Sequence, residues 1–324
     1  MHTGIGAYIR QRIEVFVRNP EYELILLVPH KNIPLFKGIR QIVFNAPIYS
    51  ISEQIYYPFV IPKCDIFWSP HYNVPLLPIR AKERWATIHD VYHLRFANTM
   101  SRVKKMYARL LYGAACHRSQ RVITVSQFSK NEILHFFDIG SKLEVIPHVV
   151  DTRSFEKQYP PELKKEVLNK FKIDFPYILF VGNIKPHKNL ITLLKAFALI
   201  AEQIDPVKLV IVGKIDGLET KDDEVFPYLN QNKSMQAKVF FTGAVEQEDL
   251  PILFQSARLF VFPSYYEGFG TPPLEALAAG LPVICSNTGP IPEVCGDRVS
   301  YFSPFDVNGL SELLLRHLKN YSSV

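Results

Sequence analysis

The chain of 324 residues is 48% hydrophobic and 21% charged, a composition typical of a globular protein with room for two domains of ordinary size. No apolar run approaches the roughly 18 residues that a membrane-spanning helix needs, and the start of the chain has no apolar signal-peptide core. The formal net charge is +6. It is concentrated in residues 1–150, which carry 19 lysines and arginines against 10 acidic residues, whereas residues 151–324 carry 18 against 21.

The basic first half predicts an acidic partner for that part of the protein. An anionic membrane surface or a phospholipid-like acceptor fits the charge, whereas no nucleic-acid-binding motif accompanies it. The four cysteines have neither CxxC nor Cys/His metal spacing, so we expect reduced thiols and no metal site. These features predict a cytoplasmic protein, with peripheral contact to the inner face of a membrane through its basic half.

The first half alternates short β-rich runs with stretches of helical length. A glycine-rich segment at residues 3–8, which contains Gly4 and Gly6, is expected to form a loop. A basic helix is expected at residues 101–112, and Ser126 is expected to cap a later helix. The β-rich runs occupy residues 22–28, 41–44, 65–68, 85–88, 121–125 and 143–146.

The second half shows the same alternation more regularly. Residues 151–176 mix charge with proline and are expected to bridge the two halves. Helices are expected at residues 190–203 and 250–257. Buried strands that alternate with helices predict a parallel α/β sheet, which binds ligands beyond the carboxyl ends of its strands. The strands are expected at residues 177–181, 208–212, 238–241, 259–262 and 282–285.

Two segments of the second half read as strand, glycine turn and helix. In residues 177–190, Gly182 ends the apolar run and Lys188 precedes the helix. In residues 259–280, Thr271 is expected as the N-cap, Pro272 as the first helical residue and Gly280 as the C-terminal stop. Backbone N–H groups that converge at such a helix start, together with the helix dipole, favour an anion.

The anion site of the second segment is expected at the amides of Gly268, Phe269, Gly270 and Thr271. The carboxylates of Glu267 and Glu275 flank it and are suited to accept hydrogen bonds from hydroxyl groups. A ligand that carries both phosphate and sugar therefore fits these residues. From spacing alone, a capped helix with a solvated glutamate remains an alternative, as does a solvated surface role for Lys188.

Both segments resemble the retaining nucleotide-sugar glycosyltransferases of family 4, which have the GT-B fold of two Rossmann-like domains facing a cleft. Glu267 and Glu275 match the E-x7-E motif of that family. The resemblance implies that Glu267 faces the donor sugar, that Glu275 holds the ribose, and that Gly182 and Lys188 grip the donor diphosphate. Asn183 stands where many members carry an arginine.

Further residues of the first half fit the same resemblance. His89, followed by Asp90 at a strand end, matches a histidine that contacts the donor sugar, with Asp90 either fixing the tautomer of His89 or capping the next helix. Gly4 and Gly6 match a glycine loop that approaches the donor phosphate. His148 and Val149 replace an Asn-Gly pair at the domain crossover, which predicts an altered hinge.

The sequence thus predicts an N-terminal acceptor-side domain at residues 1–150 and a nucleotide-sugar-binding domain at residues 151–324. The expected activity is transfer of a hexose, such as mannose, from a GDP- or UDP-linked donor to a glycan or lipid-linked acceptor, without a metal or cofactor. Compared with the family, the first strand is expected to be missing and the C-terminal end to be short. A partner-dependent or inactive fragment, or a sugar-nucleotide epimerase, remains an alternative.

Overall fold

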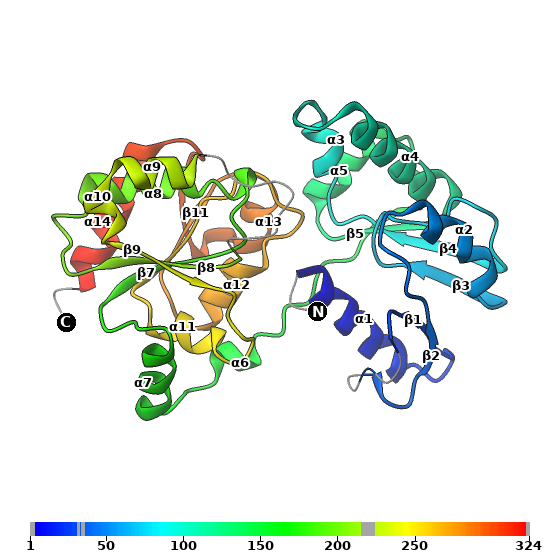
Figure 1. Cartoon of the computed structure of the whole chain (residues 1–324), viewed down its shortest axis with the longest axis horizontal. Coiled ribbons are helices and arrows are strands. Elements are labelled where there is room, and N and C mark those ends of the chain that lie inside the picture. Colours follow the sequence, from blue (N-terminus) through cyan, green and yellow to red (C-terminus); the bar gives the residue numbers. More distant parts are fainter. Residues whose placement is uncertain (1–3, 31–32, 34–35, 215–223, 322–324) are drawn as a thin grey trace. The chain divides into compact units, whose positions relative to one another are not determined.

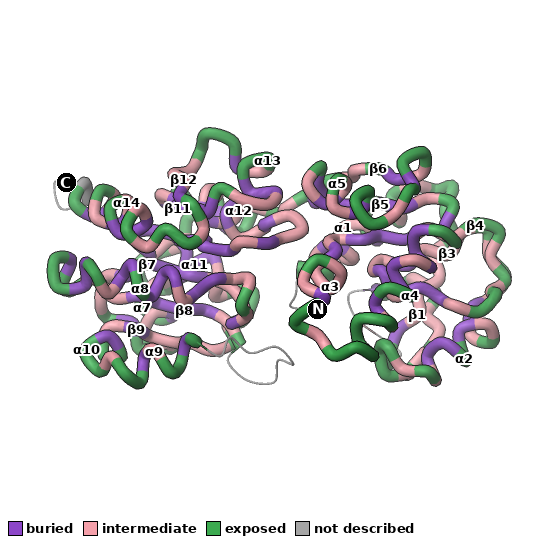
Figure 2. The backbone as a smooth tube through the Cα atoms, turned by 90° about the horizontal axis from the view of Figure 1, so that it is seen from above, coloured by how far each residue is buried: buried purple, intermediate pink, exposed green. Residues whose placement is uncertain are grey.

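The computed structural model describes residues 4–30, 33, 36–214 and 224–321 (Figure 1). The chain divides into two compact units, Met1–Val149 and Val150–Val324. Both are α/β units built on parallel sheets, as the alternating pattern predicts. In Figure 2 the buried stretches of the tube run through each unit, and the exposed stretches lie mainly at turns and helix ends.

Unit 1 contains two parallel sheets. Strands β1 (Ile25–Val28) and β2 (Arg40–Val43) pair with each other. The second sheet has the order β3-β4-β5-β6, with neighbouring strands parallel. Its strands are β3 (Cys64–Ser69), β4 (Ala81–Thr87), β5 (Arg121–Thr124) and β6 (Leu143–Val145).

The helices of unit 1 alternate with these strands. The apolar side chains of the second sheet and of α4 form one core that includes Ile88, Leu111, Tyr112 and Val122. Ser126 caps α5 through its hydroxyl, which accepts a hydrogen bond from the Ser129 amide at 3.0 Å, as predicted. The helices are α1 (Gly4–Arg18), α2 (Ile51–Val60), α3 (Tyr92–Arg95), α4 (Arg102–Arg118) and α5 (Gln127–Phe136).

The expectation of a glycine loop at residues 3–8 is wrong for the residues that the structure describes. Gly4 and Gly6 form the first turn of α1. The helix is favoured because its inward face carries Tyr8 and Ile13, which are buried and which a loop would leave exposed. Two glycines close together therefore mark a helix start here and not a loop, and the phosphate contact that the resemblance implies for them stays a prediction.

Unit 2 is built on a six-stranded sheet in the order β12-β11-β10-β7-β8-β9, in which all neighbours are parallel. Three strands, β7 (Tyr177–Val181), β8 (Lys208–Val212) and β10 (Leu259–Phe262), have the predicted bounds. The other strands are β9 (Val239–Gly243), β11 (Val283–Ser286) and β12 (Ser300–Phe302). The last was not predicted, because three residues carry too little pattern.

The strands of unit 2 are buried on both faces. In β7, Ile178 and Phe180 point to one core cluster, whereas Tyr177 and Leu179 point to the other, as the two-residue period of a strand requires. Helices α8 (Leu190–Ile200) and α14 (Val307–Tyr321) pack together over the first cluster. The second cluster lies under α7 (Pro161–Lys170), α11 (Leu250–Ser256) and α12 (Thr271–Ala278).

The shorter helices of unit 2 lie between these elements. They are α9 (Val225–Gln231), α10 (Lys233–Gln236) and α13 (Ile291–Cys295). No helix in the described part of the chain is long and apolar enough to cross a membrane.

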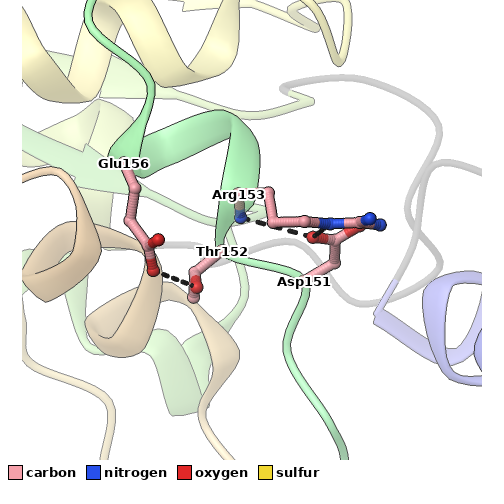
Figure 3. Close-up of polar contacts among 4 residues, drawn as sticks. All are labelled: Asp151, Thr152, Arg153 and Glu156. Atoms are coloured by element: carbon pink, nitrogen blue, oxygen red, sulfur yellow. Dashed lines mark hydrogen bonds and ion pairs between the residues drawn. The ribbon is translucent and has the colours of Figure 1, made fainter.

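The segment 151–176, which was expected to bridge the two halves, belongs to unit 2. It forms α6 (Arg153–Glu156) and α7 (Pro161–Lys170), and Phe155 and Val167 are buried in the second core cluster of unit 2. Figure 3 shows the local contacts at its start, where the Arg153 guanidinium lies 2.7 Å from the Asp151 carboxylate and the Thr152 hydroxyl donates to Glu156 at 2.5 Å. The Asp151 and Arg153 side chains are exposed, so apolar burial does more than their ion pair to hold the segment.

Candidate functional site

Two loops meet at the carboxyl edge of the unit 2 sheet, where β7 and β10 are neighbours. One loop follows β7 and the other follows β10. The Tyr265 amide donates a hydrogen bond to the His187 carbonyl at 2.9 Å, and the Asn189 side chain donates to the Pro263 carbonyl at 3.1 Å. These bonds fix the two predicted strand–turn–helix segments beside each other.

Lys188 and Glu267 come together at this junction. The Lys188 Nζ lies 2.6 Å from Glu267 Oε1, although the residues are 79 positions apart in the chain. Both side chains are largely buried, with 17% and 14% of their surface exposed. The ammonium group also lies 5.3 Å from the centre of the Phe262 ring. The lysine and the turn that were predicted to share a ligand are therefore adjacent.

Glycines allow the backbone at this edge to pack closely. Gly182 directly follows β7, as predicted, and its amide donates to the Val212 carbonyl at 2.9 Å. A Cβ atom on the neighbouring Gly213 would lie 2.1 Å from the Gly182 carbonyl oxygen. The site thus has no room for a side chain at Gly213.

The predicted cap of α12 needs a correction. Gly270, with a φ of 91°, is the N-cap, and Thr271 is already the first helical residue. A residue with a Cβ resists that left-handed conformation, which explains why a glycine takes the cap position in place of a threonine. Gly268 and Phe269 lie in the loop that precedes it. Gly280 ends the helix as predicted, with a φ of 77°.

Glu275 lies on α12 in an enclosed environment. Burial raises the pKa of its carboxyl group to about 7. No described residue forms a hydrogen bond or an ion pair with that group. An enclosed carboxylate without a partner is costly, and hydroxyl donors of a ligand would satisfy it. The ribose role that the resemblance implies for Glu275 stays a prediction.

His89 lies in unit 1, just beyond β4. Its Nε2 donates to the Pro70 carbonyl at 3.0 Å, and a carbonyl only accepts, so Nδ1 is left as an acceptor. Burial lowers the pKa of His89, which favours this neutral ring. The Asp90 carboxylate accepts a hydrogen bond from the Tyr92 amide at 2.9 Å, one residue before the N-cap Val91 of α3. The choice between its two predicted roles stays open.

Sequence reasoning missed residues that build the surroundings of His89. The Tyr8 ring, from α1, meets the His89 ring edge-on at 4.8 Å between centroids. His71 follows β3 as His89 follows β4, and the two rings lie 6.3 Å apart. The position of His71 after a β-rich run was the available signal. Within the described ranges, no group of three or more His, Cys, Asp or Glu side chains has the arrangement of a metal site.

Solved structures with a similar architecture include glycosyltransferases. WaaG, described as a glycosyltransferase involved in lipopolysaccharide biosynthesis, matches with a TM-score of 0.74 over 99% of this chain and 88% of WaaG, at 18% identity. Anabaena Alr3699/HepE, solved in complex with UDP and glucose, matches with a TM-score of 0.73 over 98% of this chain and 87% of HepE, at 18% identity. The fold is therefore that of two Rossmann-like domains.

The family follows from two family models. Residues 163–323 match "Glycosyl transferases group 1", and residues 6–154 match "Glycosyltransferase Family 4". Between them the two models account for nearly the whole chain. The chain belongs to the family 4-like glycosyltransferases of the GT-B fold.

Curated relatives are similar over much of the chain. O-antigen chain mannosyltransferase B of Escherichia coli is 31% identical over 76% of this chain and 64% of that protein. O-antigen chain mannosyltransferase RfbU of Salmonella typhimurium is 28% identical over 83% of this chain and 68% of that protein. Thus the match spans less than two thirds of the first of these relatives.

Proposed function

We propose that the protein transfers a hexose, with mannose as the first candidate, from a GDP- or UDP-linked donor to a glycan or lipid-linked acceptor in polysaccharide or lipopolysaccharide biosynthesis. The observation that carries this proposal is the Lys188–Glu267 pair at the start of α12, which puts a cation, a carboxylate and a helix N-terminus at one sheet edge. The names of the mannosyltransferase relatives support the choice of sugar.

In the proposed reaction the bond between the anomeric carbon and the diphosphate oxygen breaks, and a bond from the same carbon to the acceptor oxygen forms. The acceptor proton passes to the departing diphosphate. Lys188 and the amides of Gly268 to Thr271, with Gly182 behind them, stabilise the charge that develops on the diphosphate. Positive charge from the protein serves this purpose without a metal ion or another cofactor.

The carboxylates and the histidine have binding roles in this scheme. Glu267 accepts hydrogen bonds from the donor sugar, and Glu275 accepts them from the ribose. His89 contacts the donor sugar through the Nδ1 lone pair that its bond to Pro70 leaves available. Because the acceptor attacks from the face that the diphosphate leaves, the anomeric configuration is retained.

The test is transfer from GDP-mannose or UDP-glucose by the unmodified chain and by Lys188→Ala and Glu267→Ala. Loss of transfer in both variants supports the proposal, and unchanged rates in both would contradict it. NMR of the product distinguishes retention from inversion at the anomeric carbon, and activity after treatment with EDTA tests metal independence. A chain that binds neither nucleotide would favour the partner-dependent fragment, and epimerised donor formed without acceptor would favour an epimerase.

Peripheral contact with the cytoplasmic face of a membrane is part of the proposal. On α4 the apolar side chains of Val103, Met106 and Leu110 are exposed at spacings that share one helix face. The basic residues Arg102, Lys104, Lys105 and Arg109 are exposed beside them. Such a helix lies at a lipid interface with its apolar side chains inserted and its basic side chains on anionic headgroups.

Vesicle co-sedimentation tests this contact. We expect binding to phosphatidylglycerol vesicles that weakens with salt and is lost in the double variant Lys104→Glu/Lys105→Glu. The matched control is Lys164→Glu/Lys165→Glu on α7, which makes the same charge change in unit 2. Equal binding by both double variants would contradict the role of α4.

A further inference from the structure

A cluster of tyrosine and histidine rings lies at the carboxyl edge of β3 and β4, beside His89. The His71 ring lies 6.3 Å from the His89 ring and 4.1 Å from the Tyr72 ring. Tyr49 stacks on Tyr72 at 5.9 Å, and Tyr72 stacks on the buried Tyr112 at 4.0 Å. Ligands of parallel α/β sheets bind at this edge.

The cluster is held in place by one buried carboxylate. Glu53 is 4% exposed and accepts hydrogen bonds from the Tyr49 amide at 2.8 Å, the Asn73 side chain at 2.9 Å and the Tyr57 hydroxyl at 2.8 Å. It therefore ties the Tyr49 turn to the loop that follows β3. Tyr49 also has a φ of 65°, a costly conformation for a residue with a side chain, and such strain persists where the surroundings enforce it.

Hydrogen-bonding capacity remains at the open side of this cluster. Tyr49 is the only hydrogen-bond partner of His71 among the described residues, through Nδ1 at 3.3 Å, so the His71 Nε2 is available. Burial lowers the pKa of His71 to about 3, so the ring is neutral. A neutral Nε2 forms one further bond, as donor or as acceptor according to the tautomer. A hydroxyl group satisfies either tautomer.

Neighbouring groups have complementary capacity. Asp90 uses Oδ1 to accept from the Tyr92 amide, and within the described residues its Oδ2 has no partner. Tyr49 as a residue is 42% exposed, so part of this fixed aromatic residue is open to solvent. Hydroxyl-accepting groups beside a partly exposed aromatic residue are the complement of a pyranose ring, whose edge carries hydroxyls and whose face is apolar.

We propose that Tyr49 and His71 bind the acceptor sugar, with the Tyr49 ring against the sugar face and His71 Nε2 on one of its hydroxyl groups. The inference rests on the proposed function, in which His89 contacts the donor sugar. The two sugars must be adjacent for the acceptor oxygen to reach the anomeric carbon. The distance between the His71 and His89 rings is about that of one sugar residue to the next, which fits adjacent sites.

The test separates acceptor binding from nucleotide binding. Binding of p-nitrophenyl α-glycosides of mannose, glucose, galactose and N-acetylglucosamine to the whole chain is measured by saturation-transfer NMR in the presence of GDP. We expect at least one glycoside to bind, and Tyr49→Ala and His71→Ala each to weaken it about tenfold. Tyr49→Phe, which keeps the ring and removes the hydroxyl that contacts His71, should weaken it less than Tyr49→Ala.

The matched control is Tyr56→Ala, because Tyr56 on α2 is also an exposed tyrosine but has no ring contact with the cluster. Thermal shifts produced by GDP and UDP report nucleotide binding in the same variants. Unchanged glycoside binding in Tyr49→Ala and His71→Ala would overturn the inference, as would the absence of glycoside binding to the unmodified chain. A parallel loss of the nucleotide thermal shift would also overturn it. Failure of the proposed function would give a different result: the thermal shifts produced by GDP and UDP would be the same in Lys188→Ala as in the unmodified chain.

Discussion

The ammonium group of Lys188 and the carboxylate of Glu267 lie 2.6 Å apart at the ends of two loops that follow neighbouring strands. Lys188 ends the short helix Pro186–Lys188 after β7, and Glu267 lies in the loop after β10. The Glu267 carboxylate is therefore paired with the ammonium group that is proposed to bind the donor diphosphate. If Lys188 binds the donor diphosphate as proposed, donor binding and this ion pair compete for the same ammonium group.

Substitutions of the two partners should have opposite effects on nucleoside diphosphate affinity. Lys188→Ala removes a charge-assisted hydrogen bond, so we expect GDP or UDP to bind about 10- to 100-fold more weakly. Glu267→Gln leaves the lysine in place and removes its competitor, so we expect diphosphate affinity to stay the same or to rise. Isothermal titration calorimetry with GDP and UDP measures both.

The control for this pair is Lys195→Ala, which removes one exposed lysine from α8 without touching the loops. Equal affinities for Lys188→Ala and Lys195→Ala would show that Lys188 does not contact the diphosphate. A loss of affinity in Glu267→Gln as large as that in Lys188→Ala would argue that the pair acts as a structural unit.

Glu275 should make unit 2 less stable as the pH rises. Burial raises the pKa of its carboxyl group from 4.5 to about 7, so the folded chain holds this proton more tightly than the unfolded chain. The resulting stabilisation is complete below about pH 4.5 and is lost as the pH rises to about 7, and it amounts to on the order of 3 kcal/mol at most. Glutamine cannot ionise. The free energy of unfolding of Glu275→Gln should therefore rise relative to that of the unmodified chain as the pH increases from about 4.5 to about 7.

Urea unfolding at pH 5 and pH 8 measures this effect. The difference in unfolding free energy between Glu275→Gln and the unmodified chain should grow with pH, whereas Glu248→Gln, at an exposed position, should show no such trend. If ribose hydroxyls bind the carboxylate, nucleotide binding should release a proton near pH 7. Calorimetry in buffers of different ionisation enthalpy detects that proton, and a pH-independent Glu275→Gln difference would refute the raised pKa.

Gly213→Ala should damage the fold far more than Gly280→Ala. A Cβ atom at position 213 would lie 2.1 Å from the Gly182 carbonyl oxygen, a backbone atom that has no room to move within the sheet edge. At position 280 a Cβ atom meets nothing within 4 Å, and only the φ of 77° opposes alanine, at about 1–2 kcal/mol. Thermal unfolding of the two variants gives the comparison. Similar decreases in melting temperature in the two variants would mean that the backbone at Gly182 moves readily to make room for the Cβ atom.

Local patterns predicted those parts of the fold where burial alone decides the structure. Strands β7, β8 and β10 are apolar on both faces, and their predicted bounds match the structure. At residues 4–6 the glycine spacing was misleading, because the burial of Tyr8 and Ile13 outweighs the low helix propensity of glycine. The cap at Gly270 was misplaced by one residue because a positive φ leaves no mark in the pattern.

Part of the candidate site could be predicted from the positions of the predicted strands. Lys188 and Glu267 each follow a predicted strand, and strand ends of a parallel sheet share one edge, so their proximity could be anticipated once β7 and β10 were taken as neighbours. The Tyr49–His71 contact could not be anticipated. It depends on Glu53, whose three hydrogen bonds link segments that no local pattern connects.

His148 should make unit 1 sensitive to acid, in the opposite direction to Glu275 in unit 2. Burial, with further contributions from His89 and Arg12, lowers the pKa of His148 from 6.5 to about 4. The neutral ring packs edge-on against Tyr8 at 5.7 Å. Because the folded pKa is depressed, the stabilisation is complete above about pH 6.5 and is lost as the pH falls toward 4, and it is on the order of 3 kcal/mol at most.

Hydrogen exchange measured peptide by peptide at pH 7 and pH 5, corrected for intrinsic rates, reports the two units separately. Peptides from β4 and β5 should lose protection at pH 5 in the unmodified chain and lose less in His148→Gln, which keeps a polar side chain that does not titrate. His135→Gln, at an exposed position of α5, should behave as the unmodified chain. If the loss of hydrogen-exchange protection at pH 5 is the same in His148→Gln and His135→Gln, protonation of His148 does not cause the opening of unit 1.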